Sequence, residues 1–83
     1  MASDVVYWRV HVKADVRNKD AVAIRKLINT YSARKLIHEF GDSKVYDLVL
    51  PDGFAPLLDE ALRPYREWVY VDFKNEPFEW VKE

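Results

Sequence analysis

Apolar and polar side chains alternate along two segments of the chain, 5–13 (VVYWRVHVK) and 66–74 (REWVYVDFK). A period of two is typical of a β-strand with one apolar and one polar face, and the Val-rich, aromatic composition favours the same structure. We therefore predict a strand near 5–13 and another near 66–74. The apolar side chains, which should face a helical layer, are Val6, Trp8, Val10 and Val12 in the first segment and Val69, Val71 and Phe73 in the second.

Two further segments, 34–40 (RKLIHEF) and 44–50 (KVYDLVL), lie on either side of the sequence GDS at 41–43. Glycine tolerates a positive φ, and an aspartate side chain bonds readily to its own backbone, so these three residues predict a turn. The flanking segments then form a β-hairpin, with strands near 34–40 and 44–50. The alternation in 34–40 is irregular, and the sequence leaves open which face of the sheet carries His38.

Apolar residues recur with helical spacing in two places. In the first they are Ala21, Ile24, Leu27, Ile28 and Tyr31, and in the second Phe54, Leu57, Leu58, Ala61 and Leu62. We predict helices near 19–31 and 54–63. Asn18 is expected to cap the first helix, because its side chain accepts a hydrogen bond from a first-turn amide. Pro64 is expected to end the second, because the residue before a proline is pushed out of the helical region.

The predicted order of elements is β-α-β-β-α-β. Because crossover connections are right-handed, this order most simply gives a ferredoxin-like α+β sandwich: a four-stranded antiparallel sheet in the order 4-1-3-2, with two helices on one face. A chain of 83 residues is one domain, 1–83. The last segment, 75–83, is a C-terminal tail that carries Phe78 and Trp80, and we expect it to dock on the domain.

A two-layer sandwich covers only one face of its sheet, so the other face is predicted to be open. Strands one, three and four are neighbours in the order 4-1-3-2, and their outward side chains form one patch. The residues predicted on this patch are Tyr7, Arg9, His11, Lys13, Val45, Asp47, Val49, Trp68, Tyr70 and Asp72.

The composition of the patch is typical of an interaction surface. Trp, Tyr and Arg carry much of the binding energy at protein interfaces, and a contiguous exposed apolar patch usually marks a binding site. The patch therefore predicts docking of another protein or of a second copy of this chain. The expected anchors are Tyr7, Arg9, His11, Trp68 and Tyr70. The alternative is that the tail folds back over the patch and places Trp80 in the core, which would weaken this argument.

The residue types argue against most catalytic and cofactor chemistry. The chain has no cysteine, which excludes disulfides, thiolate zinc sites and cysteine nucleophiles. Its two histidines, His11 and His38, lie on different strands, whereas metal binding needs several converging ligands. No serine lies in a nucleophile motif, and the connection at 14–18 (ADVRN) has no glycine for a phosphate cradle. We predict no metal, no cofactor and no enzymatic activity.

The charge is nearly balanced overall but uneven along the chain. The net charge is −1, with nine Lys/Arg against five Asp/Glu in residues 1–44 and four against nine in residues 45–83. Such a distribution favours electrostatic steering of a partner, although a mixed solvated surface has the same composition. A secondary basic patch, suited to an acidic partner or simply solvated, is expected from Arg25, Lys26, Arg34 and Lys35.

The cytoplasm is the expected location. No apolar run approaches the roughly 18 residues of a membrane span, and the first residues lack the basic and then apolar pattern of a secretory signal. The absence of cysteine gives no reason to expect an oxidising compartment.

Three functions remain open at this point, and the leading one is a small non-catalytic protein-interaction module, namely an adaptor, a small complex subunit or an inhibitor. The second is an RNA-binding domain, because RNA-recognition motifs share this element order and stack bases on sheet aromatics. However, the segment 44–50 lacks their basic-Gly-aromatic pattern, and Asp47 and the net charge oppose a polyanion. The third, a homodimeric small-ligand-sensing domain, is suggested by the fold alone.

Overall fold

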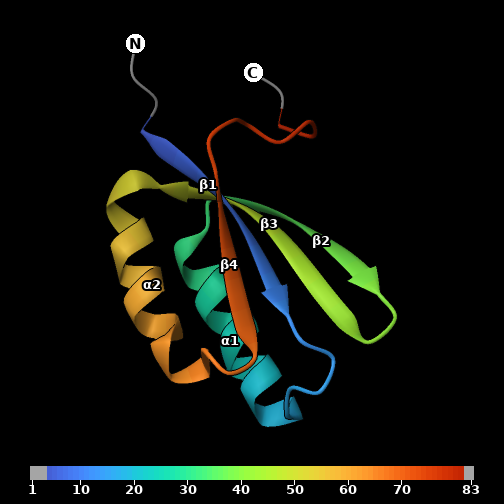
Figure 1. Ribbon diagram of the computed structural model, residues 1–83. Coiled ribbons are helices and arrows are strands. Elements are labelled where there is room, and N and C mark those ends of the chain that lie inside the picture. Colours follow the sequence, from blue (N-terminus) through green and yellow to red (C-terminus); the bar gives the residue numbers. More distant parts are fainter. Residues whose placement is uncertain (1–3, 82–83) are drawn as a thin grey trace.

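The computed structural model describes residues 4–81 and contains one sheet covered by helices (Figure 1). In chain order the elements are β1 (Val5–Val12), α1 (Asn18–Tyr31), β2 (Arg34–Phe40), β3 (Ser43–Pro51), the short 3-10 helix η1 (Asp52–Phe54), α2 (Ala55–Leu62), a second 3-10 helix η2 (Arg63–Tyr65) and β4 (Val69–Lys74). The strands and α-helices follow the predicted βαββαβ order.

The four strands pair in the order β2-β3-β1-β4, and every neighbouring pair is antiparallel. Read from the other edge, this is the predicted order 4-1-3-2. Both α-helices lie on the same face of the sheet (Figure 1), as right-handed crossovers require. The prediction of a ferredoxin-like α+β sandwich is therefore confirmed.

The core lies between the sheet and the two helices and is built from alternate residues of the strands. Fully burying one aliphatic or aromatic side chain contributes about 1.5–3 kcal/mol, so this cluster is the main source of stability. Its buried members are Trp8, Val10, Val12, Ile24, Ile28, Tyr46, Leu48, Leu50, Leu58, Leu62 and Val69.

Phe73 is an exception on the apolar face of β4, because 63% of it is exposed. Its ring meets the ring of Trp8 edge to face, with centroids 5.2 Å apart. The expectation that the helical layer covers this side chain is wrong. The reason is that β4 is an edge strand, and a side chain near the end of an edge strand has neighbours on one side only.

Lys13 and Trp68 belong to the predicted strands 5–13 and 66–74 but lie just outside β1 and β4 in the structure. β4 begins at Val69 rather than at residue 66, because residues 66–68 form a turn in which the N–H of Trp68 donates to the carbonyl of Tyr65 at 2.9 Å. The carbonyl of Trp68 in turn accepts a hydrogen bond from the N–H of Lys13 at 2.9 Å. Both side chains therefore stand at one end of the β1–β4 pair.

The start of α1 differs from the predicted cap by one residue. Asn18 is the first helical residue, and the capping position is held by Arg17 in an extended conformation, with φ −67° and ψ 145°. The carbonyl of Arg17 accepts from the N–H of Ala21 at 2.8 Å and so begins the helical ladder. An arginine side chain has no acceptor, and no side chain caps this end of α1.

The β2–β3 hairpin closes through a two-residue loop, Gly41-Asp42, with Phe40 opposite Ser43. Gly41 has φ 63°, the left-handed conformation that glycine adopts without steric cost. β2 forms the outer edge of the sheet and lies away from both helices (Figure 1). As a result Leu36, Ile37 and Phe40 are 40%, 40% and 65% exposed.

After β4 the chain turns back across the sheet, towards the side that carries β3 and β2 (Figure 1). Phe78 in this segment is only 8% exposed, so the tail docks on the face opposite the helices. Residues 82–83 of the predicted tail lie outside the described residues.

Candidate interaction surface

Asp47 is the centre of the face opposite the helices. The register of β3 places it opposite Arg9 of β1 on one side and Leu36 of β2 on the other. Arg9 in turn lies opposite Asp72 of β4. The pairing therefore puts one arginine between two acidic residues of neighbouring strands, and it brings residues from four separate segments of the chain onto one surface.

The carboxylate of Asp47 is 1% exposed and receives hydrogen bonds from three side chains. Arg9 donates Nε–H to Oδ1 at 2.7 Å and Nη2–H to Oδ2 at 3.2 Å. The Nε2 atom of His38 lies 3.0 Å from Oδ2, and Trp80 donates its indole N–H to the same oxygen at 3.2 Å. Such multiple bonding is what allows a carboxylate to remain buried.

These contacts determine the protonation of the pair. Burial by itself would raise the pKa of Asp47, but the hydrogen bonds from Arg9, His38 and Trp80, together with the charge of Arg9, outweigh it and hold the pKa below its ordinary value. The hydrogen bond to Asp47 correspondingly raises the pKa of Arg9, against the opposing effect of burial. Asp47 is therefore ionised, and the charge of Arg9 balances its own. It is not the exposed acid that the sequence suggests.

Two rings of the tail cover one half of the open face. Phe78 meets the ring of Tyr7 edge to face at 5.9 Å and stacks on Trp80 at 5.6 Å. The guanidinium of Arg9 lies 5.4 Å from the centroid of Phe78, and that of Arg34 lies 5.4 Å from the centroid of Trp80. Such cation–π contacts add about 0.5–1 kcal/mol each at partly exposed sites.

The structure therefore overturns part of the predicted surface. Three residues expected to be exposed there are buried: Val45 is 9% exposed, Asp47 1% and Val49 5%. Tyr7 and Arg9, two of the expected anchors, contact the tail and are only partly exposed. The physical reason is that the rings of the tail, and long side chains from neighbouring strands, remove more apolar area from water by lying on the sheet than by pointing into solvent.

The other half of the open face stays uncovered. His11 and His38 both lie opposite Val45 of β3, one from each side. Around this row is a hollow of about 260 Å³, lined by Arg9, His11, His38, Phe40 and Val45. Tyr70 adjoins it, 63% exposed and with its ring centroid 5.6 Å from that of His11. We call the hollow itself, without Tyr70, the histidine hollow.

The predicted face contains residues of strands one, three and four only, whereas in the structure β2 contributes to it as well. The residues that β2 adds are Arg34, Leu36, His38 and Phe40. The signal that could have placed them is the two-residue loop, because pairing Phe40 with Ser43 fixes the register of every earlier residue of the strand.

The remaining predicted residues are not gathered into one site. Arg34 and Lys35 are consecutive in a strand, so they point to opposite faces. Arg25 and Lys26 are exposed on α1. Asp72 lies on the open face but forms an ion pair with Lys74, with Nζ 3.1 Å from Oδ2.

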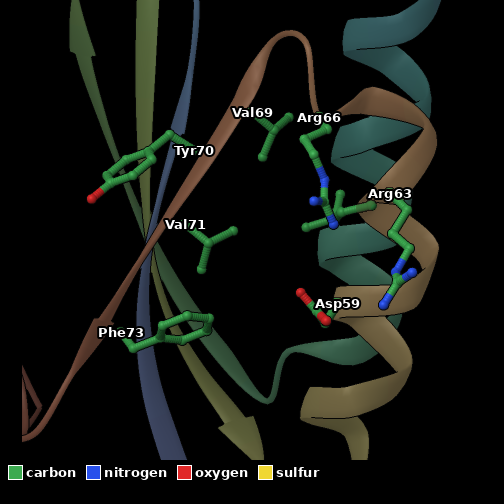
Figure 2. A pocket seen from close by; sticks show the side chains of 8 residues that line it. Asp59, Arg63, Arg66, Val69, Tyr70, Val71 and Phe73 are labelled. Atoms are coloured by element: carbon green, nitrogen blue, oxygen red, sulfur yellow. The ribbon is translucent and has the colours of Figure 1, made fainter.

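A second hollow, of about 290 Å³, lies on the helical side of β4. Figure 2 shows Val69, Val71 and Phe73 pointing toward α2 and η2, while Tyr70 points away on the open face. The full set of lining residues is Asp59, Leu62, Arg63, Arg66, Val69, Tyr70, Val71 and Phe73. It lies beside the free edge of β4 and is separate from the histidine hollow.

Within residues 4–81, no group of three or more His, Asp or Glu side chains is arranged to hold a metal ion. Over the same residues, neither helix combines the length and the apolar character that a membrane span requires. The chain matches no known protein-family model and no curated protein.

Proposed function

We propose that this protein is a small non-catalytic interaction module that binds a protein partner through the histidine hollow and Tyr70. The observation that carries the proposal is the contrast between the halves of the open face. One half is filled by Phe78 and Trp80, whereas the other keeps a hollow of about 260 Å³ beside exposed aromatic rings. Rings with a polar edge are the residues that dominate protein interfaces.

A protein partner fits the charges of this face better than RNA does. Two cations of this face are paired with acids, Arg9 with Asp47 and Lys74 with Asp72. Cations that are already neutralised contribute little to the phosphate contacts from which RNA affinity largely arises. Phe40 and Tyr70 are nevertheless exposed rings on which bases could stack, so RNA is the second candidate and an explicit outcome of the test below.

The size of the histidine hollow also favours a protein. Pockets for small ligands usually enclose about 300–1,000 Å³, which is more than the 260 Å³ found here. A shallow hollow of this size suits one large apolar side chain of a partner. The absence of cysteine supports a cytoplasmic location, because the fold needs no oxidising environment.

The proposal is tested by comparing variants in a capture experiment. Tagged wild-type protein is used to isolate partners, and the affinity of the purified partner is then measured for Tyr70→Ser and His11→Ala. Each substitution should weaken binding by about fivefold or more, as expected for an interface anchor worth more than about 1 kcal/mol. Leu57→Ser on α2, 51% exposed, is the matched control and should bind like the wild type.

Two results would contradict the proposal. One is a partner whose affinity changes with Leu57→Ser but not with Tyr70→Ser or His11→Ala. The other is capture of a nuclease-sensitive species whose binding falls steeply with salt concentration and is lost in Tyr70→Ser, which would assign the same surface to RNA.

A further inference from the structure

The outer edge of β2 is open. β2 pairs with β3 on one side, and within residues 4–81 no strand lies on its other side. An edge strand presents alternate N–H and C=O groups that can pair with another strand. Apolar side chains are exposed on both of its faces, because Leu36 and Phe40 lie on the open face and Ile37 on the helical face.

We infer that two copies of this chain pair antiparallel through β2, about a two-fold axis at Ile37. In that register Ile37 faces Ile37 of the second copy. Lys35 faces Glu39 of the second copy, and Glu39 faces its Lys35. Opposite charges directly across an antiparallel pair are favourable, and the two-fold axis produces the contact twice. The result is one continuous sheet of eight strands.

The remaining pairs of this register are also compatible. On the open face Leu36 lies opposite His38 of the second copy, and Arg34 lies opposite Phe40, where a cation can meet an aromatic ring. Residues that face each other are both odd-numbered or both even-numbered. Successive residues of a strand alternate both in the direction of their backbone groups and in the face that carries their side chains. In this register, the outward N–H and C=O groups of the two copies therefore meet, and both helical layers lie on the same side of the joined sheet.

Neighbouring two-fold registers do not give this match. An axis at Leu36 pairs Lys35 with Ile37, and an axis at His38 pairs Glu39 with Ile37, so a charge meets an apolar side chain in each. The other free edge, β4, is less suited: an axis at Asp72 places two aspartates face to face, and an axis at Val71 pairs Tyr70 with Asp72 and brings no opposite charges together. The charges of β4 are also paired within one chain, Lys74 with Asp72. Charge complementarity thus selects β2 and the axis at Ile37.

Charge reversal tests the register directly. Sedimentation equilibrium of the purified full chain should show a concentration-dependent dimer. Lys35→Glu or Glu39→Lys replaces two attractive contacts by two repulsive ones and should raise the dissociation constant about tenfold. The double variant Lys35→Glu/Glu39→Lys restores the pairing and should return within about threefold of the wild type. Lys26→Glu on α1 makes the same change of charge away from β2 and should have no effect.

A thiol placed on the axis gives an independent readout, since the chain contains no cysteine. Ile37→Cys should form a disulfide between copies under mild oxidation, because cross-strand Cα separations of about 4.5–5.5 Å lie within the range of a disulfide. Lys35→Cys should not, because its equivalents lie four residues apart along the paired strands. A monomer at all concentrations, equal cross-linking of both variants, or no rescue by the double charge reversal would each overturn the inference.

The inference does not depend on the proposed docking function. It uses the edge of β2, whereas the substitutions that test docking, Tyr70→Ser and His11→Ala, lie on β4 and β1. Loss of partner binding with an intact dimer, and loss of the dimer with intact partner binding, are therefore distinguishable results.

Discussion

Trp80 donates its indole N–H to Oδ2 of Asp47 at 3.2 Å, which joins the C-terminal tail to the centre of the sheet across 33 residues of chain. The contact gives the tail a polar anchor beside the apolar one that Phe78 provides. A segment held by a polar and an apolar contact is an integral part of the fold. This relationship also decides how much of the open face is left for a partner.

Removing the apolar anchor should destabilise the protein. Phe78→Ala deletes a ring that is 8% exposed, and the free energy of unfolding should fall by about 3 kcal/mol. Phe73→Ala is the matched control: the same substitution at a ring that is 63% exposed should cost about 1 kcal/mol or less, mostly from its contact with Trp8. Chemical denaturation measures both. Equal losses would show that the tail does not pack as described.

Breaking the partly buried Arg9–Asp47 ion pair from one side should cost more than removing both partners. Arg9→Met leaves the carboxylate of Asp47 buried with two hydrogen bonds, from His38 and Trp80, in place of four. We expect a loss of about 2–3 kcal/mol. The double variant Arg9→Met/Asp47→Leu has no buried charge to leave unpaired and should be more stable than Arg9→Met alone. A double-mutant cycle in urea gives the comparison. A double variant less stable than both single variants would contradict it.

Asp47 should also give the stability a specific dependence on pH. Its pKa in the folded protein is below the ordinary value of 3.8, so the unfolded chain binds the proton more readily. The stabilisation is therefore fully present above pH 3.8 and is lost as the pH falls through the lower folded pKa. Measured from about pH 6 to about pH 2.5, the stability difference between wild type and Asp47→Asn should stay constant and then shrink at the acid end. A stability difference that grows on acidification would contradict this prediction, because the effect of Asp47 would then have the opposite dependence on pH.

The uncapped start of α1 offers a stabilising substitution. Arg17→Asp places an acceptor at the capping position and a negative charge at the positive end of the helix dipole, and should raise the free energy of unfolding by about 1 kcal/mol. Asn18→Ala, one residue later, removes a side chain from inside the helix and should change it little. Thermal and urea denaturation of the two variants distinguish the capping residues. If Asn18→Ala instead lowers the free energy of unfolding markedly, Asn18 is the capping residue that the sequence predicts.

The sequence by itself determined the architecture. Strict alternation in β1 and β4, helical spacing in α1 and α2, and the turn at Gly41 are local patterns, and each predicts an element close to its place in the structure. Right-handed connections then leave one simple order for the strands. The face of β1 that enters the core was readable for the same reason, because a period of two fixes which side chains point together.

Only the tertiary structure decided what covers the open face. The contact between Trp80 and Asp47, and the stacking of Arg34 on Trp80, join segments that are far apart in the chain, and no local pattern encodes which partner a docking ring selects. The alternation along its strand predicts that Asp47 is an exposed acid. It is buried because Arg9, His38 and Trp80, from three other segments, form hydrogen bonds with its carboxylate. Periodicity assigns a side chain to a face, whereas its burial depends on what the rest of the chain places upon that face.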